Sequence, residues 1–156
     1  MHTEPILIID DDEVLLRALS QTIELRMSTV NVEIVTSAQE ALRLLQKHRY
    51  SAIISDIKMP GMDGLELLTH VQEQYPDIPV LLITGYHNRK MALQALQAGA
   101  YDYIRKPIER DDFVAALSRA LSTYQLRQQI KEQQSLLERY ALSYGHLAKQ
   151  PDMGGL

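Results

Sequence analysis

Short apolar runs alternate along this chain with longer stretches in which apolar residues recur at helical spacing. The apolar runs cover residues 6–9, 52–54 and 80–83, and residues 32–35 and 101–104, each interrupted by one acidic residue, supply the remaining two strands. Runs that are apolar at consecutive positions are typical of strands buried on both faces of a parallel sheet. One of the helical stretches includes Val14, Leu15, Ala18, Leu19 and Ile23. The pattern predicts five consecutive strand–helix units.

Two of the predicted helices begin with a capping signature. Ser37 precedes Glu40 by three residues, and Asp63 precedes Glu66 at the same distance. Ser and Asp side chains accept backbone N–H groups of the first helical turn, and a carboxylate three residues later completes the pattern. These signatures fix where the helices start, and the last helix is predicted to open near Glu109.

Regular alternation of strands and helices favours a doubly wound α/β fold, with helices on both faces of a five-stranded parallel sheet. Ligands of such folds bind in the crevice at the carboxyl ends of the strands. Asp10, Asp11 and Asp12 follow the first predicted strand, Asp56 ends the third, Thr84 ends the fourth, and Lys106 stands at the end of the fifth. These residues are therefore the candidates for a functional site.

The candidate residues indicate one kind of chemistry. Several carboxylates in one crevice repel each other unless a cation is bound or protons are taken up. Oxygen ligands without a nearby His or Cys favour Mg²⁺ over zinc or copper. A hydroxyl from Thr84 and a positive charge from Lys106 suit a phosphoryl group, which makes Asp56 the candidate nucleophile. Asp12 is instead expected to cap the following helix.

Each candidate also has a simpler explanation when it is taken alone. An acidic triplet after a strand is often a solvated turn, and Asp56 could be a turn residue before Pro60 and Gly61. Thr84 could merely end a strand, and Lys106 could be a surface lysine. Their joint occurrence at successive strand ends favours a common site.

Five motifs resemble the receiver domain of two-component response regulators, in particular the chemotaxis-regulator-like members. They are IIDD at 8–11, SDIKMPGMDG at 55–64, ITG at 83–85, AGAYDYI at 98–104 and KP at 106–107. The resemblance covers about residues 4–122. It implies a flavodoxin-like sheet with strand order 2-1-3-4-5, and a cis peptide bond between Lys106 and Pro107.

The resemblance also implies a role for each candidate residue. Asp56 would be phosphorylated in a reaction that requires Mg²⁺. The metal would be bound by Asp10, Asp11, Asp56 and the backbone carbonyl of Lys58. Thr84 and Lys106 would hold the phosphoryl group. Because the carboxylates are crowded, Asp11→Asn is expected to weaken Mg²⁺ binding and to stabilise the metal-free fold.

The resemblance assigns further roles to three positions. Tyr103 would act with Thr84 as a switch, although an aromatic residue on a strand is often plain core. Lys58 and Tyr86 occupy positions that govern the lifetime of the phosphoryl group. Both side chains are bulky, so self-dephosphorylation is expected to be slow.

A receiver of this kind takes its phosphoryl group from a sensor histidine kinase or a phosphotransfer protein. It then changes a binding face, made by the fourth and fifth helices, for a downstream effector domain or protein. Asp56 is itself modified, so the chain is expected not to be a turnover enzyme. The alternative is a pseudo-receiver that serves as a dimerisation or scaffold module without phosphorylation. The complete set of candidate residues argues against that alternative.

The helical pattern continues beyond the receiver, and residues 123–150 are predicted to form a helical extension. A stripe with steps of four and three residues, as in a coiled coil, contains Leu126, Ile130, Gln133, Leu137, Tyr140, Tyr144 and Leu147. This helix could form a parallel homodimer, pack back on its own receiver, or be the stalk of a longer protein. Residues 151–156 are expected to be disordered.

Composition narrows the remaining possibilities. The 156 residues suffice for one domain with a small appendage, and 46% of them are hydrophobic. A net charge of -4 provides no basic surplus, so direct contact with nucleic acid is not expected. The chain contains no cysteine and no apolar run near the roughly 20 residues that span a bilayer. The sequence therefore predicts a cytoplasmic protein without a membrane segment.

Overall fold

A computed structural model describes residues 4–85 and 89–149 of the chain, the last four of them by their backbone alone. Strands and helices alternate strictly from the first strand to the last helix. The elements are β1 (Ile6–Ile9), α1 (Glu13–Arg26), β2 (Val32–Val35), α2 (Ala38–Lys47), β3 (Ala52–Asp56), α3 (Gly64–Gln74), β4 (Val80–Thr84), α4 (Arg89–Gln97), β5 (Asp102–Arg105) and α5 (Arg110–Lys149). Contacts divide the chain into two compact units, with the division inside α5 after Tyr124.

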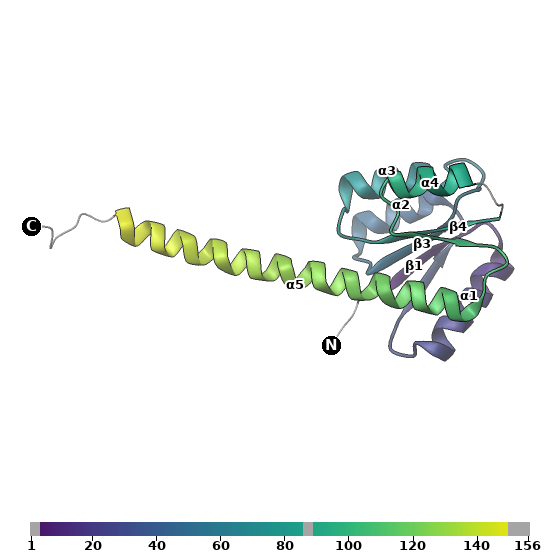
Figure 1. The fold of residues 1–156 in the computed structure, drawn as a ribbon, viewed down its shortest axis with the longest axis horizontal. Helices are drawn as coiled ribbons and strands as arrows, with labels where there is room; N and C mark the ends of the chain where they lie inside the picture. Colours follow the sequence, from purple (N-terminus) through teal and green to yellow (C-terminus); the bar gives the residue numbers. More distant parts are fainter. Residues whose placement is uncertain (1–3, 86–88, 150–156) are drawn as a thin grey trace, which may run out of the picture. The chain divides into compact units, whose positions relative to one another are not determined.

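The first unit contains a five-stranded sheet with the order β2-β1-β3-β4-β5, and every pair of neighbouring strands is parallel (Figure 1). The predicted doubly wound fold and its strand order are therefore confirmed. Because all five strands run in the same direction, their carboxyl ends lie at one edge of the sheet. Side chains that follow different strands can meet there.

Two hydrophobic clusters cover the two faces of the sheet. Leu7 and Ile9 of β1 pack with α2, α3 and α4, whereas Ile6 and Ile8 pack with α1 and the first part of α5. Figure 1 shows the same division of the helices between the faces. Successive strand residues point to opposite faces, so a strand covered on both sides must be apolar at every position. This requirement explains the unbroken apolar runs of β1, β3 and β4.

The predicted helix caps are confirmed. The side chain of Asp12 accepts the backbone N–H groups of Val14 and Leu15, at 3.0 and 3.3 Å. Ser37 Oγ accepts the N–H of Glu40 at 3.2 Å, and Asp63 Oδ1 accepts the N–H of Glu66 at 2.9 Å. Each cap satisfies a donor of the first turn that has no partner within its helix.

Two strands end at polar residues, as predicted. The apolar runs end at Ile54 and Ile83, but β3 extends to Asp56 and β4 extends to Thr84. The sheet continues there because backbone hydrogen bonds do not depend on side-chain polarity: Ile57 N–H donates to the carbonyl of Ile83 at 2.9 Å. Strand β5 differs from the prediction, because it begins and ends one residue later than the expected 101–104.

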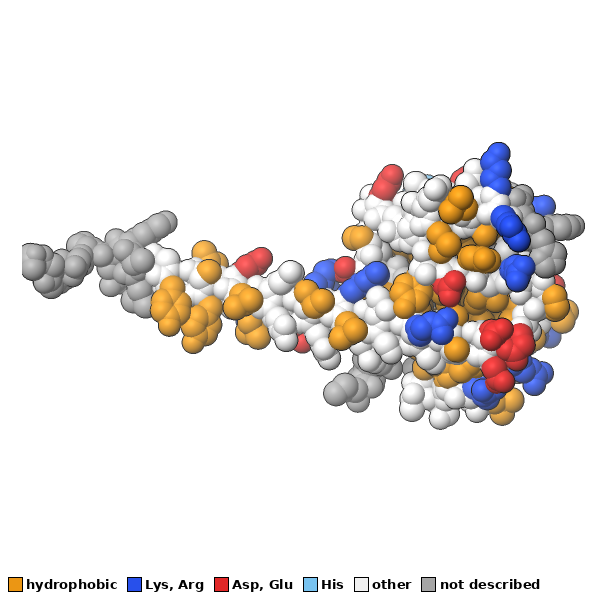
Figure 2. Space-filling model, in the orientation of Figure 1, with side chains coloured by type: hydrophobic (Ala, Val, Ile, Leu, Met, Phe, Trp, Pro, Cys, Tyr) orange, Lys and Arg blue, Asp and Glu red, His pale blue; other side chains and the backbone are white. Residues whose placement is uncertain are grey.

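The second unit, residues 125–156, contributes the later part of α5. Several large hydrophobic side chains of this segment are exposed, among them Leu126, Ile130, Leu137, Tyr140 and Tyr144 (Figure 2). The rings of Tyr140 and Tyr144 lie 5.4 Å apart, one helical turn from each other. The side chain of Leu147 and the predicted disordered tail at 151–156 lie outside the described residues. Within the described part of the chain, no helix is long and apolar enough to cross a membrane.

Candidate functional site

The strand-end residues gather at the carboxyl edge of the sheet. Asp10 follows β1 directly, Asp56 ends β3, Thr84 ends β4, and Lys106 follows β5. Asp10 is 0% exposed, Asp56 6% and Thr84 4%. Three buried polar side chains at adjoining strand ends need polar partners or a ligand, since an unpaired buried polar group is costly.

Asp10, Asp11 and Asp56 form an acidic cluster in which one carboxylate oxygen of each lies within 4.8 Å of the others. Asp11 is exposed, whereas the other two are buried. Asp10 Oδ1 accepts the backbone N–H of Asp12 at 2.9 Å. Asp10 Oδ2 is buried and has no hydrogen-bond partner among the described residues. That oxygen is therefore available to a ligand outside the chain.

The environment of Asp10 disfavours its charged form. Burial raises the pKa of Asp10 from 3.8 to about 6, and the negative charge of Asp56 adds to the increase. The N–H of Asp12 and the charge of Lys106 act in the opposite direction without cancelling it. The metal-free cluster is thus under electrostatic strain, which a bound cation would relieve.

Lys106 links the acidic cluster to the last strand. Its Nζ lies 3.0 Å from Asp56 Oδ2 and forms an ion pair with it. Burial by itself would lower the pKa of Lys106, but the hydrogen bond and the charges of Asp56, Asp10 and Asp12 raise it overall. Lys106 is therefore held in its charged form beside Asp56. Its backbone N–H donates to the carbonyl of Thr84 at 2.9 Å, which ties the end of β5 to the end of β4.

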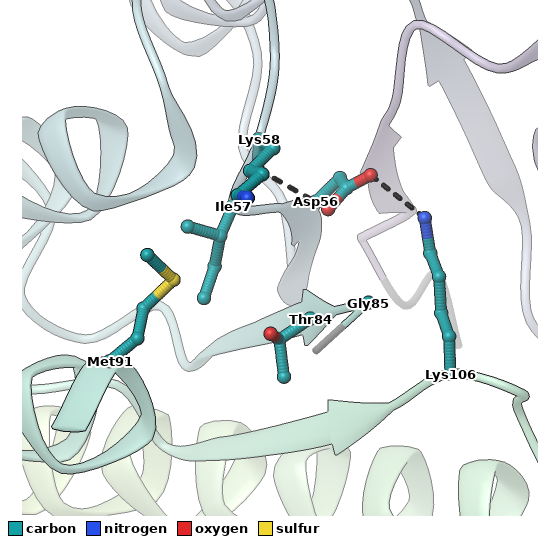
Figure 3. A pocket seen from close by; sticks show the side chains of 7 residues that line it. All are labelled: Asp56, Ile57, Lys58, Thr84, Gly85, Met91 and Lys106. Atoms are coloured by element: carbon teal, nitrogen blue, oxygen red, sulfur yellow. Dashed lines mark hydrogen bonds and ion pairs between the residues drawn. The ribbon is translucent and has the colours of Figure 1, made fainter. Parts of the chain in front are cut away.

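A pocket of about 350 Å³ opens beside Asp56 (Figure 3). Its walls come from the ends of β3 and β4, from α4 and from the residue after β5. The lining residues are Asp56, Ile57, Lys58, Thr84, Gly85, Met91 and Lys106. The pocket brings the candidate nucleophile, a hydroxyl and two lysines around one space, which suits a small anion.

Hydrogen bonds fix the backbone where β3 ends and α3 begins. Ser55 Oγ of β3 donates to the carbonyl of Asp56 at 3.0 Å, and the N–H of Gly64, the first residue of α3, donates to the carbonyl of Ile57 at 2.8 Å. A Cβ added at Gly64 would meet the carbonyl of Asp56 and would lie 2.9 Å from the Cα of Ile57. Gly61, in the loop between β3 and α3, has a φ of 76°, which glycine adopts without strain. The segment from the end of β3 to the start of α3 thus requires glycine at two positions for different reasons.

Gly64→Ala is expected to destabilise the protein by about 1–3 kcal/mol, because the added methyl group has no space and the end of β3 must shift. Gly85→Ala is the matched control, since its Cβ would meet the nearest atom, Lys106 Cδ, at 3.8 Å. That control is expected to be neutral or to stabilise by up to about 1 kcal/mol. Denaturant unfolding measures both changes. Equal changes in stability for Gly64→Ala and Gly85→Ala would show that the space at Gly64 accommodates a methyl group.

Tyr103 lies outside this pocket. It is half-buried on β5 and lines a separate groove of about 430 Å³ between β5 and α5, to which Lys106 also contributes. Tyr103 is therefore not among the residues that line the pocket beside Asp56. Its proposed switching role with Thr84 stays a prediction.

The structure places five of the predicted residues together, namely Asp10, Asp11, Asp56, Thr84 and Lys106. Lys58 lines the pocket, and its N–H donates to Asp56 Oδ1 at 3.4 Å. The roles of these residues in metal binding and phosphorylation stay predictions. Tyr86 lies outside the described residues.

One backbone feature of this region agrees with the resemblance, and two residues that line the pocket were not predicted. The peptide bond between Lys106 and Pro107 is cis, as the resemblance implied. The sequence reasoning missed Ile57 and Met91 as lining residues. Ile57 directly follows Asp56 and could have been suspected, whereas nothing in the sequence relates Met91 to the pocket.

The acidic cluster fits Mg²⁺. The ion takes oxygen ligands, and this cluster offers only carboxylates, one of which has a buried oxygen without a partner in the described chain. Asp10, Asp11 and Asp56 would hold the ion, and the resemblance adds the carbonyl of Lys58.

Comparisons with known proteins agree with this geometry. The profile of the response regulator receiver domain matches residues 6–118. The signal receiver domain of an HD domain-containing protein from Pseudomonas fluorescens Pf-5 has a crystal structure that superposes with a TM-score of 0.76 at 30% identity, covering 83% of this chain and 95% of that one.

Two curated relatives are much longer than this chain. The C4-dicarboxylate transport transcriptional regulatory protein DctD of Rhizobium meliloti (strain 1021) is 45% identical over 115 residues, which are 74% of this chain and 25% of DctD. DctD of Pseudomonas aeruginosa is 38% identical over 141 residues, 90% of this chain and 29% of that protein. The latter similarity continues past residue 118 into the segment formed by α5. The matched region thus spans about a quarter of either relative.

The profile covers most of the chain, and the fold, the strand order and the placement of the acidic residues agree with it. Receiver domains of this family are signalling modules of two-component systems. The chain belongs to the family of response regulator receiver domains.

Proposed function

We propose that Asp56 is the phosphoryl acceptor of this receiver and takes the group from the phosphohistidine of a sensor kinase or phosphotransfer protein. The observation that carries the proposal is the position of Asp56. Its side chain belongs to the acidic cluster, in which Asp10 Oδ2 is buried without a hydrogen-bond partner among the described residues, and Asp56 Oδ2 lies 3.0 Å from Lys106 Nζ, beside a pocket of about 350 Å³.

In this reaction a carboxylate oxygen of Asp56 attacks phosphorus, and the bond from phosphorus to the imidazole nitrogen breaks. The imidazole keeps the electron pair and takes a proton from solvent. Lys106 would leave its ion pair with Asp56 to bind a phosphoryl oxygen, and the hydroxyl of Thr84 would donate to another. Bound Mg²⁺ would offset the negative charge of the carboxylates and of the transferred group. Asp56 is changed in the reaction, so the domain acts as an acceptor and not as a turnover enzyme.

Phosphorylation of Asp56 would then change the shape of a protein surface. Thr84 would move toward the phosphoryl group, and Tyr103 would turn on β5, in the groove beside α5. Such a shift requires that the phosphoryl group bind one arrangement better than the other. An effector domain or partner protein would read the altered surface, as expected for a chain that matches about a quarter of longer regulators.

We further propose that residues 4–122 form the receiver and that residues 123–150 form a coiled coil with a second copy of the chain. The stripe from Leu126 to Tyr144 is exposed and repeats at steps of four and three residues. A single exposed helix of this length is marginally stable in water, and burial against a partner helix would stabilise it.

Incubation with acetyl phosphate is expected to add the mass of one phosphoryl group when Mg²⁺ is present and none when it is chelated. Asp56→Asn, which keeps the shape of the side chain, is expected to abolish the mass shift. Intact-mass spectrometry measures both, with another receiver as a positive control. An unshifted wild-type mass under conditions that label the control would favour the phosphorylation-independent scaffold.

A further inference from the structure

Two apolar side chains form a wall of the pocket beside Asp56, among the residues that the structure describes. Ile57, which is 2% exposed, and Met91, which is half-buried, form this wall, while Lys106 lies on the opposite side (Figure 3). Figure 3 shows the side chain of Met91 reaching from α4 toward Ile57 and the pocket. A group attached to Asp56 would therefore have charged partners on one side and a hydrocarbon and thioether surface on the other.

Met91 lies on the side of α4 that faces the hydrophobic cluster and the pocket, whereas its neighbour Leu93 is exposed. Met91 packs against the hydrophobic cluster that includes Ile57, Leu67 and Ala95, and it also lines the pocket. Leu93, two residues later, is 56% exposed and does not line the pocket. Residues two positions apart on a helix point to nearly opposite sides, so Met91 and Leu93 form a natural pair for comparison.

We propose that Met91 limits the access of water to the phosphoryl group on Asp56 and so prolongs the phosphorylated state. The proposal rests on the phosphorylation of Asp56 proposed above. In hydrolysis, a water oxygen attacks phosphorus, the bond between phosphorus and the Asp56 oxygen breaks, and the electron pair returns to the carboxylate. The water loses a proton, and inorganic phosphate leaves.

The chemistry of the methionine side chain explains this role. An attacking water must be held by hydrogen-bond partners, and a thioether is only a weak acceptor. The unbranched methionine side chain also fills irregular gaps well, so it leaves little space for an ordered water. The polar lining residues Thr84 and Lys106 would already be engaged with phosphoryl oxygens. A smaller or more polar side chain in place of Met91 would therefore open this wall to a reactive water.

The test follows the loss of the phosphoryl group from the full chain. The protein is phosphorylated with acetyl phosphate and Mg²⁺, the donor is removed by gel filtration, and intact mass is recorded over time. Met91→Ala is expected to lose the group several-fold faster than wild type. Met91→Gln, which keeps the length of the side chain but can bind water, is expected to be faster as well. Met91→Leu restores an apolar wall and is expected to match wild type.

Leu93→Ala is the control for a general loosening of α4 and is expected to leave the decay unchanged. An equal acceleration in Leu93→Ala, or no acceleration in Met91→Ala and Met91→Gln, would overturn the role of Met91 while leaving the phosphorylation of Asp56 intact. A wild-type protein that takes up no phosphoryl group would overturn both. The initial rate of phosphorylation distinguishes faster hydrolysis from impaired uptake of the phosphoryl group. An opened wall speeds hydrolysis without slowing uptake from a small donor.

Discussion

Replacing Asp10 by asparagine is expected to stabilise the metal-free protein by up to about 3 kcal/mol above pH 6, while it weakens the binding of Mg²⁺. The folded-state pKa of Asp10 is about 6, above its ordinary value of 3.8, because the carboxyl group is buried beside Asp56. Asparagine has nearly the same shape and can still accept the N–H of Asp12. It removes the buried charge but also removes a metal ligand.

The pH dependence of stability also tests whether the charged form of Asp10 destabilises the metal-free protein. A group whose pKa is raised on folding stabilises the folded state when it is protonated, so its contribution is present below pH 4 and is lost as the pH rises toward 6. The metal-free wild type should therefore lose stability over this window relative to Asp10→Asn. The two proteins should converge at low pH, where Asp10 is neutral.

Denaturant unfolding with a chelator present measures the difference. Asp11→Asn is the matched control, because Asp11 belongs to the same cluster but is exposed to solvent. Its effect on stability should be smaller, although Mg²⁺ binding should weaken in both variants. A metal-free Asp10→Asn protein that is less stable than wild type at neutral pH would show that the cluster is not strained.

Leu137→Asp is expected to convert a dimer into a monomer. Leu137 lies in the middle of the exposed stripe on α5 and is 68% exposed in the single chain. In a parallel coiled coil it would face its counterpart, so aspartate would bury two like charges without partners, which costs several kcal/mol. The receiver should still accept a phosphoryl group, because the substitution lies in the other unit of the chain.

Sedimentation at tens of micromolar protein distinguishes the two states. Leu142→Asp provides the control: it removes an equally large leucine that is 75% exposed but lies off the stripe, and it should leave the dimer intact. A monomeric wild type would show that the stripe does not join two copies of this chain. Dissociation by both substitutions would point to loss of helix stability instead of loss of an interface.

The sequence was sufficient for the fold because three of the strands contain an uninterrupted apolar run and most helix starts carry a cap. Asp12, Ser37 and Asp63 could be recognised as caps, since capping depends on local chemistry within three residues. The ends of β3 at Asp56 and of β4 at Thr84 also agree with the prediction. The bounds of β5 were less accessible, because both of its end residues are polar and the strand lies one residue later than predicted.

The residues at the strand ends could be predicted from the sequence, but which carboxylate is buried and which helix completes the pocket could not. Parallel strands bring their carboxyl ends together, which was enough to group Asp10, Asp56, Thr84 and Lys106. Whether Asp10 or Asp11 is the buried carboxylate depends on how the chain turns after β1, and the sequence alone favoured neither. Met91 joins the pocket from a different helix, and only the packing of α4 on the sheet reveals it.

Hydride trapping of the phosphorylated protein shows which residue carries the phosphoryl group. Borohydride reduces an aspartyl phosphate to homoserine, and tandem mass spectrometry then identifies the modified residue. We expect homoserine at position 56 after treatment with acetyl phosphate and Mg²⁺, and none in Asp56→Asn. Homoserine at another aspartate, or none at all while a control receiver is converted, would contradict the proposed phosphorylation of Asp56.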